Sequence, residues 1–227
     1  MKKVIISVIL GLCALGLLYA CFASIYNDIS FDEEKAMREE LVKQRLLQIR
    51  DAQDKFKQTH KEYCGTMDSL IDFVKNDRAI AKINKSGEIP KNLADEITEE
   101  EAYKRGFLHN DTVWASTAAL LGIDNPDSLR YVPCGKKGAE IQMRKNQMYN
   151  MKTESFEMLL EARASLDDYL DGMDAKKVKY LKADLKERGK NRADLFEDNT
   201  DDEEGNWYGL RIGDLKDAGN KNAGNWE

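Results

Sequence analysis

The feature that most constrains this chain is an uncharged run of twenty-three residues near its amino terminus, from Val4 to Tyr26. About 20 apolar residues are enough to cross the ~30 Å hydrocarbon core of a bilayer as a helix. The apolar part of a cleaved secretory signal has only about 7–15 residues. The run therefore predicts an uncleaved membrane anchor formed by residues 1–27.

A second interpretation of this run rests on Cys21. The residues Leu18-Tyr19-Ala20-Cys21 resemble a bacterial lipoprotein box, in which the chain is cut before the cysteine and lipidated there. Tyr19 is bulky where such a box has a small residue, and apolar residues follow Cys21 where a polar tether is expected. These departures favour the uncleaved anchor and leave lipidation at Cys21 as the alternative.

The charges on either side of the run indicate its orientation. Lys2 and Lys3 precede it, and four acidic residues follow it between Asp28 and Glu34. Lysine and arginine beside a membrane span stay on the cytoplasmic side. We therefore expect the amino terminus to be cytoplasmic and everything after residue 27 to lie outside the cytoplasm.

The composition of the remaining residues narrows the functional classes. The chain has a formal net charge of −6, and its basic and acidic residues are interspersed without a basic stripe. Nucleic-acid binding therefore has no electrostatic support. About 200 residues outside the membrane suit one domain on a stalk better than two full domains.

The cysteines and histidines form no metal-ligand pattern. Two of the four cysteines, Cys13 and Cys21, lie inside the apolar run. The other two, Cys64 and Cys134, lie outside it, where a disulfide can form, and they are either bonded to each other or two separate buried thiols. Neither belongs to a CxxC pair, and the two histidines have no zinc-ligand spacing, so we expect no metal site and no cofactor.

A helical pattern free of glycine and proline extends from Asp32 to His60. Its apolar residues recur every seven positions, with one more at an intermediate position: Val42, Ile49, Phe56 and Tyr63, with Leu46. Such a stripe packs against a partner surface. We predict a packing helix over residues 28–65 that lies on a sheet, and a self-associating coiled coil is the alternative.

Residues 66–227 predict a small α+β domain. Helices are expected at Ser69–Asp77, Ala102–Arg105 and Ala175–Arg188, the second behind a capping box of Thr98 and Glu101. Strands are expected at Ala79–Ile83, Thr112–Trp114, Leu129–Val132, Ala139–Met143 and Trp207–Gly213, while Phe156–Ala164 fits either a strand or a helix. We expect Ile49, Phe56 and Tyr63 to lie beneath an antiparallel sheet that includes Leu129–Val132, with Leu70 and Phe73 closing one end.

Part of the helical segment resembles a known family. The residues Ile49-Arg50-Asp51-Ala52-Gln53, followed by Phe56 and by Tyr63-Cys64-Gly65, are similar to a segment of type IV pilins and pseudopilins. In that family a membrane-anchored long helix packs on a small antiparallel sheet. The prepilin cleavage motif is missing here, and Val4 to Tyr26 contains no acidic residue.

A second resemblance covers most of the chain. The segments Leu70-Ile71-Asp72-Phe73, Asp127-Ser128-Leu129-Arg130-Tyr131-Val132-Pro133 and Asn222-Ala223-Gly224-Asn225-Trp226-Glu227 look like those of a family of single-span envelope proteins from Bacteroidetes-type bacteria. This resemblance implies a single-pass inner-membrane anchor and a periplasmic α+β domain. It carries over no catalytic residue.

Other candidate sites are few. Small residues let helices approach closely in lipid, which makes Gly11, Ala14 and Gly16 candidates for a partner interface. Trp207 and Trp226 are candidates at the carboxyl end, because exposed aromatic residues anchor interfaces, although Trp207 could instead cover a sheet edge. The acidic run Asp198, Asp201, Asp202, Glu203 and Glu204 offers calcium ligands without EF-hand spacing, and a solvated loop is the simpler interpretation.

No acid, base, nucleophile or metal set converges in the sequence. We therefore expect a non-enzymatic assembly subunit that binds other envelope or inner-membrane proteins, in a secretion, pseudopilus-like or proton-driven energy-transducing complex. The alternative is a periplasmic enzyme or a protein that binds cell-wall glycan.

Overall fold

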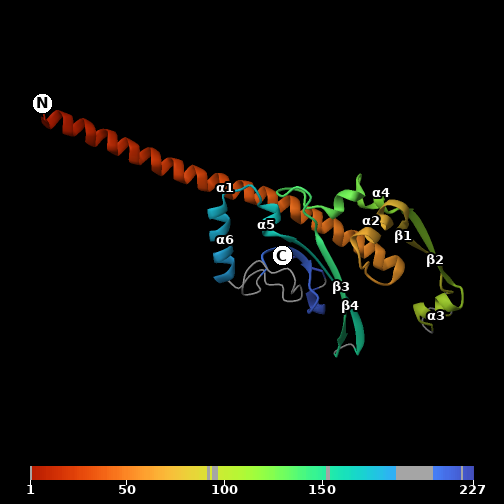
Figure 1. Ribbon diagram of the computed structural model, residues 1–227. Helices are drawn as coiled ribbons and strands as arrows, with labels where there is room; N and C mark the ends of the chain where they lie inside the picture. Colours follow the sequence, from red (N-terminus) through yellow and green to blue (C-terminus); the bar gives the residue numbers. More distant parts are fainter. Residues whose placement is uncertain (1, 91–92, 94–96, 152–153, 188–206, 221) are drawn as a thin grey trace.

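The computed structural model describes residues 2–90, 93, 97–151, 154–187, 207–220 and 222–227, and for residues 2–9 and 23–25 it describes the backbone alone. Its first element, α1 (Lys2–His60), is a single helix of 59 residues. This helix begins as a rod that stands clear of the other elements and then runs along the folded domain (Figure 1). Small antiparallel sheets complete the chain, which confirms the predicted α+β class.

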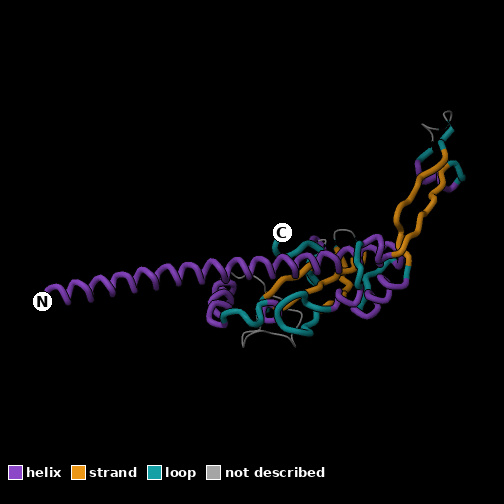
Figure 2. The backbone as a smooth tube through the Cα atoms, turned by 90° about the horizontal axis from the view of Figure 1, so that it is seen from above, coloured by secondary structure: helices purple, strands orange, loops and turns teal. Residues whose placement is uncertain are grey.

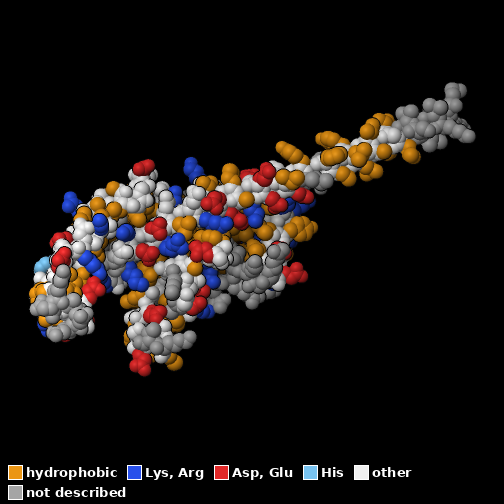
Figure 3. Space-filling view, turned by 180° about the vertical axis from the view of Figure 1, so that it is seen from behind, with side chains coloured by type: hydrophobic (Ala, Val, Ile, Leu, Met, Phe, Trp, Pro, Cys, Tyr) orange, Lys and Arg blue, Asp and Glu red, His pale blue; other side chains and the backbone are white. Residues whose placement is uncertain are grey.

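The amino-terminal part of α1 buries none of its described side chains. All residues from Leu10 to Phe22 are exposed, and hydrophobic side chains line this part of the rod (Figure 3). Among the described residues, α1 is the one helix long and apolar enough to cross a membrane. It continues from this apolar part into the domain without a break.

The carboxyl-terminal part of α1 forms the centre of the core. Val42, Leu46, Ile49 and Ala52 are 0% exposed, so the predicted apolar stripe is buried within the chain's own domain. Phe56 is only partly buried and packs edge-on against Phe73, with ring centroids 5.1 Å apart. Because the domain itself covers these positions, they are not available for the alternative coiled coil.

A three-stranded antiparallel sheet lies against this helix. Its strands are β3 (Gln142–Asn150), β4 (Ser155–Ser165) and β5 (Gly209–Gly213), in the order β3-β4-β5. Met143, Ala162 and Ile212 stand opposite one another across the three strands and belong to the same core as Ile49. The ambiguous segment from Phe156 to Ala164 is therefore a strand.

A second, two-stranded sheet projects from the far end of the domain. β1 (Arg78–Gly87) pairs with β2 (Leu108–Ser116), and the connection between them carries the short helix α3 (Glu99–Lys104) (Figure 2). The predicted capping box forms, because Thr98 accepts from the Glu101 N–H and the Glu101 carboxylate accepts from the Thr98 N–H. Both strands agree with the predicted positions.

Short helices fill the space around α1. They are α2 (Met67–Asn76), α4 (Thr117–Leu121), α5 (Leu166–Tyr169) and α6 (Ala175–Glu187), with the 3-10 turns η1 (Pro126–Arg130) and η2 (Ala218–Asn220). The amphipathic α2 packs on α1 and buries Leu70 and Phe73, as expected.

The predicted strand from Leu129 to Val132 is wrong. This segment overlaps η1, and only Tyr131 makes an isolated bridge, to Glu140. Pro126 starts the turn with a fixed φ, and the Asn125 carbonyl accepts from both the N–H and the hydroxyl of Ser128. Leu129 still enters the core at 0% exposure, so the apolar residue is buried without the predicted strand.

Gln53 is a polar residue within the buried stripe, and it determines how the chain leaves α1. Its side chain is 0% exposed and bonds both backbone groups of Cys64: the oxygen accepts from the Cys64 N–H at 2.8 Å, and the nitrogen donates to the Cys64 carbonyl at 3.0 Å. A buried backbone group left without a partner is costly. The amide therefore fixes residues after His60 against the helix.

Replacing Ile49 with alanine is expected to lower the free energy of unfolding by about 2–5 kcal/mol, the usual cost of emptying a fully buried aliphatic site. Denaturant unfolding of the full chain in detergent measures this. Gln44→Ala, on the exposed side of the same helix, is the control and should change stability by less than about 0.5 kcal/mol. Equal stability of both variants would mean that the stripe is not the core.

Gln53→Leu should destabilise the chain by about 1–3 kcal/mol, because two buried backbone groups of Cys64 lose their partner while the packed volume stays similar. Hydrogen exchange should show faster exchange of the Cys64 amide than in the unmodified chain. An unchanged exchange rate at Cys64 would contradict the assigned role of Gln53.

Candidate functional site

The two cysteines outside the apolar run are free and lie far apart. The Cys64 backbone is held by Gln53, whereas the Cys134 thiol lies 3.6 Å from the Arg38 carbonyl. Fifteen residues of helix separate Gln53 from Arg38, or about 22 Å, and a disulfide needs its Cα atoms within about 7 Å. The candidate disulfide is therefore wrong, and the alternative of two separate thiols holds. Burial raises the pKa of the Cys134 thiol, so it is a poor nucleophile, although nearby Arg38 opposes this shift.

The two candidate tryptophans belong to the fold. Trp207 is 1% exposed, and the Arg163 guanidinium lies 4.9 Å from its ring centroid. Trp226 is partly buried against the main core, near Lys43 of α1. Trp207 is thus excluded as an exposed anchor. Trp226 helps to hold the tail on α1, where Glu227 also pairs with Arg50 at 3.2 Å.

The small residues of the apolar run remain accessible. Gly11, Ala14 and Gly16 are exposed, and no atom of another segment lies within 4 Å of the position that a Cβ would take at either glycine. This surface is open to lipid or to another helix. Its use as an interface stays a prediction.

Metal and nucleophile chemistry find no support in the described residues. The acidic run from Asp198 to Glu204 lies outside them, and within them no group of three or more His, Cys, Asp or Glu side chains could hold a metal ion. His60 stacks on Phe56 with ring centroids 4.2 Å apart. His109 is exposed on β2. Neither histidine of the described residues hydrogen-bonds to a serine, cysteine or carboxylate.

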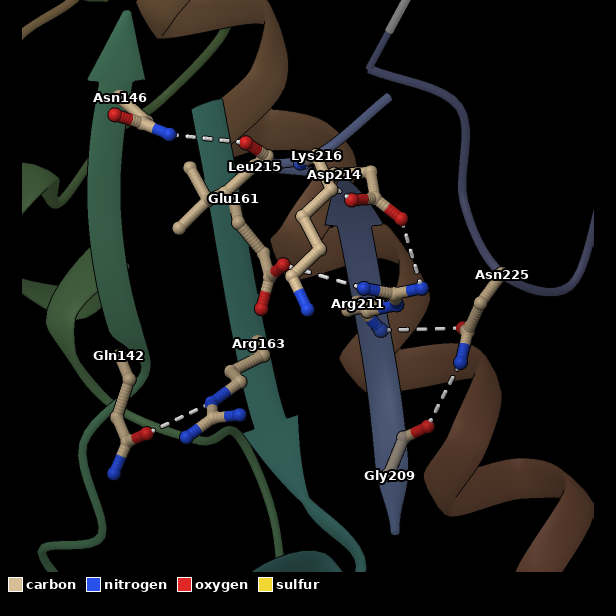
Figure 4. Close-up of polar contacts among 10 residues, drawn as sticks. All are labelled: Gln142, Asn146, Glu161, Arg163, Gly209, Arg211, Asp214, Leu215, Lys216 and Asn225. Carbon is tan, nitrogen blue, oxygen red and sulfur yellow. Dashed lines mark hydrogen bonds and ion pairs between the residues drawn. The ribbon is translucent and has the colours of Figure 1, made fainter. Parts of the chain in front are cut away.

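A network of charged side chains lies on the face of the three-stranded sheet opposite the core (Figure 4). Glu161 and Arg163 come from β4 and Arg211 from β5. The Arg211 guanidinium donates to Glu161 at 3.2 Å and to Asp214 at 3.1 Å, and thereby bridges the two carboxylates. The Arg163 Nε donates to Gln142 on β3 at 2.9 Å. All three strands are tied together on this face.

Burying the Glu161 carboxylate in this network costs free energy. It is 2% exposed, and Oε1 has no hydrogen-bond partner in the described part of the chain. Burial raises the pKa of its carboxyl, and the positive charges of Arg211 and Arg163 only partly oppose that shift. The carboxylate is too enclosed to meet a substrate, so it acts as a structural charge.

A cleft of about 560 Å³ opens next to this network and shares Asp214 with it. One wall is the end of α1, the second is β4 from Phe156 to Leu159, and the third is the segment after β5. The lining residues are Asp54, Lys57, Lys61, Tyr63, Phe156, Glu157, Met158, Leu159, Asp214, Asp217 and Asn222. Its walls combine charged and apolar side chains, which suits binding.

Most polar groups of the cleft are already engaged. Both the Lys57 ammonium and the Asn222 amide donate to the Tyr63 hydroxyl, at 3.1 and 2.7 Å. Asp217 accepts from the Gly219 N–H. The Asp54 carboxylate, in contrast, forms no ion pair within 4 Å in the described part of the chain. Partial burial raises its pKa, with a further contribution from Asp51, while Arg50 and Lys57 oppose it.

Comparisons with known proteins found no match to a protein-family model, to a curated protein or to a solved structure. The resemblances to pilins and to the envelope family therefore stay predictions. The assignment of a candidate site rests on geometry alone.

Sequence reasoning missed this cluster because it left residues 156–164 open between helix and strand. The alternation in Glu161-Ala162-Arg163-Ala164 was a usable signal, since period two places the charges on one face and the alanines on the other. The cleft itself had no such signal. Its walls come from segments about 100 residues apart.

The raised pKa of Glu161 predicts a pH dependence of stability. Below the unfolded-state pKa of about 4.3 the carboxyl is protonated in both states, and its contribution to stability is complete. As the pH rises through the higher folded-state pKa, the buried group must ionise and that contribution is lost. Relative to Glu161→Gln, the unmodified chain should therefore gain stability as the pH falls from 7 towards 4.3.

Denaturant unfolding of both chains between pH 4 and pH 7 measures this difference. Glu157→Gln, four residues away on the same strand, is the control and should not reproduce the trend. A difference between the unmodified chain and Glu161→Gln that does not vary with pH would contradict the raised pKa.

Proposed function

We propose that this protein is a membrane-anchored, periplasmic interaction subunit of a multi-protein envelope complex. The observation that carries the proposal is α1 itself, whose exposed apolar part and buried core part belong to one helix. A helix rises about 1.5 Å per residue, so its 59 residues are about 90 Å long. The chain can thus hold a domain in a fixed direction from a membrane.

Contacts immediately after the apolar run support a rigid rather than tethered domain. The Lys177 ammonium of α6 donates to the Asn27 carbonyl at 2.9 Å and pairs with Asp28 at 2.7 Å. One turn further along α1 lies Phe31, and the same ammonium is 5.3 Å from its ring centroid. α6 thus braces the helix where it would leave the bilayer.

A second brace follows on the same helix. The Arg38 guanidinium donates to the carbonyls of Tyr169 and Asp171, at 3.1 and 2.8 Å. Both residues lie at or just after α5. Two connections within the first turns of the soluble part leave little freedom for the domain to swing about the anchor.

Exposed apolar and aromatic side chains lie at the opposite end of the domain. The β1–β2 hairpin exposes Val113 and Trp114 by 45% and 47%, and the end of β3 and start of β4 expose Tyr149 and Phe156 by 49% and 66%. Exposed aromatic side chains are favoured anchors at protein interfaces. A subunit that presents such residues at the distal end of a rigid rod fits an assembly role better than turnover of a substrate.

The finer parts of this proposal come from the sequence. The positive charges before the apolar run predict a cytoplasmic amino terminus, and the envelope-family resemblance favours an inner membrane and a periplasmic domain. The partners are other envelope or inner-membrane proteins. Secretion, pseudopilus-like and proton-driven energy-transducing complexes are the candidate hosts.

Photo-crosslinking in native membranes tests the proposal. A photoreactive amino acid at Trp114 or Phe156 should give adducts with another membrane-associated protein. The same group at Gln44, on the exposed side of α1, is the matched control and should give fewer. Absence of adducts at both hairpin positions, in a chain that is membrane-bound and folded, would reject the assembly role.

The mass of the chain recovered from the membrane tests whether the anchor stays attached. An uncleaved anchor predicts that the mass includes the apolar run from Val4 to Tyr26. A lipidated chain that begins at Cys21 would overturn both the topology and the continuous-rod argument.

A further inference from the structure

One edge of β4 is only half covered. The strand spans Ser155–Ser165, but β5 pairs with it only from Glu161 to Ser165. β5 ends at Gly213, and the chain then turns away through Asp214 and Leu215. Among the described strands, none pairs with the β5 side of residues Phe156–Leu159.

The hydrogen-bonding groups of this open edge can be assigned from the register. The Leu166 N–H donates to the Tyr208 carbonyl at 2.9 Å, in line with the β4–β5 pairing. In an antiparallel pair, every second residue directs both its N–H and its C=O to the same neighbour. Even-numbered residues of β4 therefore face β5, and Met158 and Phe156 direct theirs to the open side.

The cleft is located at this edge. Four consecutive residues of β4, Phe156 to Leu159, line it. Successive side chains of a strand point to opposite faces, so four consecutive residues can border one cavity only when the strand meets it edge-on. The cleft of about 560 Å³ thus occupies the place that a longer β5 would take.

The side chains around the cleft define what fits it. Four carboxylates and two lysines line it, which gives an excess of negative charge. Among the described residues Asp54 forms neither an ion pair nor a hydrogen bond, whereas Asp214 pairs with Arg211 and Asp217 accepts from the Gly219 N–H. On the side of the sheet that faces α1, Phe156 packs edge-on against Tyr149, with ring centroids 5.2 Å apart, and leaves an apolar surface exposed.

We infer that the open edge of β4 in this cleft binds an extended polypeptide segment by strand addition, with a lysine or arginine of that segment against Asp54. Strand addition uses main-chain hydrogen bonds for affinity and alternate side chains for specificity. The segment continues the sheet where β5 stops, with its basic side chains on the α1 side and its alternate, apolar side chains on the opposite face, where Leu159 lines the cleft. This inference rests on the proposed role as an interaction subunit and names the chemistry of its partner.

Fluorescence anisotropy of the full chain in detergent, with labelled synthetic peptides, tests the inference. The probe is a seven-residue peptide of alternating lysine and valine, about 23 Å long when extended and long enough to span the open edge. It should bind saturably. A peptide of alternating glutamate and valine should bind at least about tenfold more weakly, because it places negative charge against Asp54.

Two changes, one in the peptide and one in the protein, separate strand addition from simple charge attraction. N-methylation of alternate peptide amides keeps the charge but removes the donors along one edge, and should weaken binding about tenfold. Asp54→Asn should weaken binding of the lysine peptide about fivefold, whereas Asp51→Asn, on the same helix but outside the cleft, should not.

Hydrogen exchange locates the site. The bound lysine peptide should slow exchange of the Phe156 and Met158 amides, because each then donates to the peptide. Absence of saturable binding, equal binding of the N-methylated peptide, or protection confined to other strands would each overturn the inference. Failure here is distinguishable from failure of the proposed function, because crosslinking from Trp114 in membranes does not depend on the cleft.

Discussion

Burial of one stripe of α1 is the interaction on which the rest of the structure depends. Val42, Leu46 and Ile49 contribute fully buried side chains to a core that also draws on β3, β4, β5 and α2. Sheets this small are marginal without a surface to cover one face. The helix therefore supplies the common surface that the later elements pack on, and the same helix carries the apolar run. The core of the domain and the apolar run are thus coupled through a single element.

Polar contacts fix the path of the backbone at points where hydrophobic packing alone would not. Gln53 holds the Cys64 backbone and determines where the chain goes after the helix. On the other face of the sheet, Arg211 bridges Glu161 and Asp214 and ties β4 to the segment after β5. Truncating one partner of a buried charge pair costs more than the pair contributes. These contacts therefore specify one arrangement of the sheet rather than simply adding stability.

The same features support the proposed binding role. The buried charges of the described residues are enclosed, and the cleft of about 560 Å³ borders a strand edge rather than a convergent acid and base. Natural proteins usually shorten or cover such edges, because they template pairing with other chains. Here the edge lies beside a carboxylate without an ion partner, at the far side of the domain from the braced end of α1.

The sequence by itself determined the long helix, the apolar run and the buried stripe, because each is a local pattern with a period of its own. It also predicted β1, β2, α2 and the capping box at Thr98. It predicted a strand at Leu129, whose β-prone neighbours follow a proline that favours a turn. It did not decide between strand and helix for β4, although Glu161 and Arg163 alternate with alanines. The distance between Cys64 and Cys134, the burial of Trp207 and the cleft were decided by tertiary structure alone. Each depends on how segments far apart in the chain are placed around one helix, and no local spacing encodes that placement.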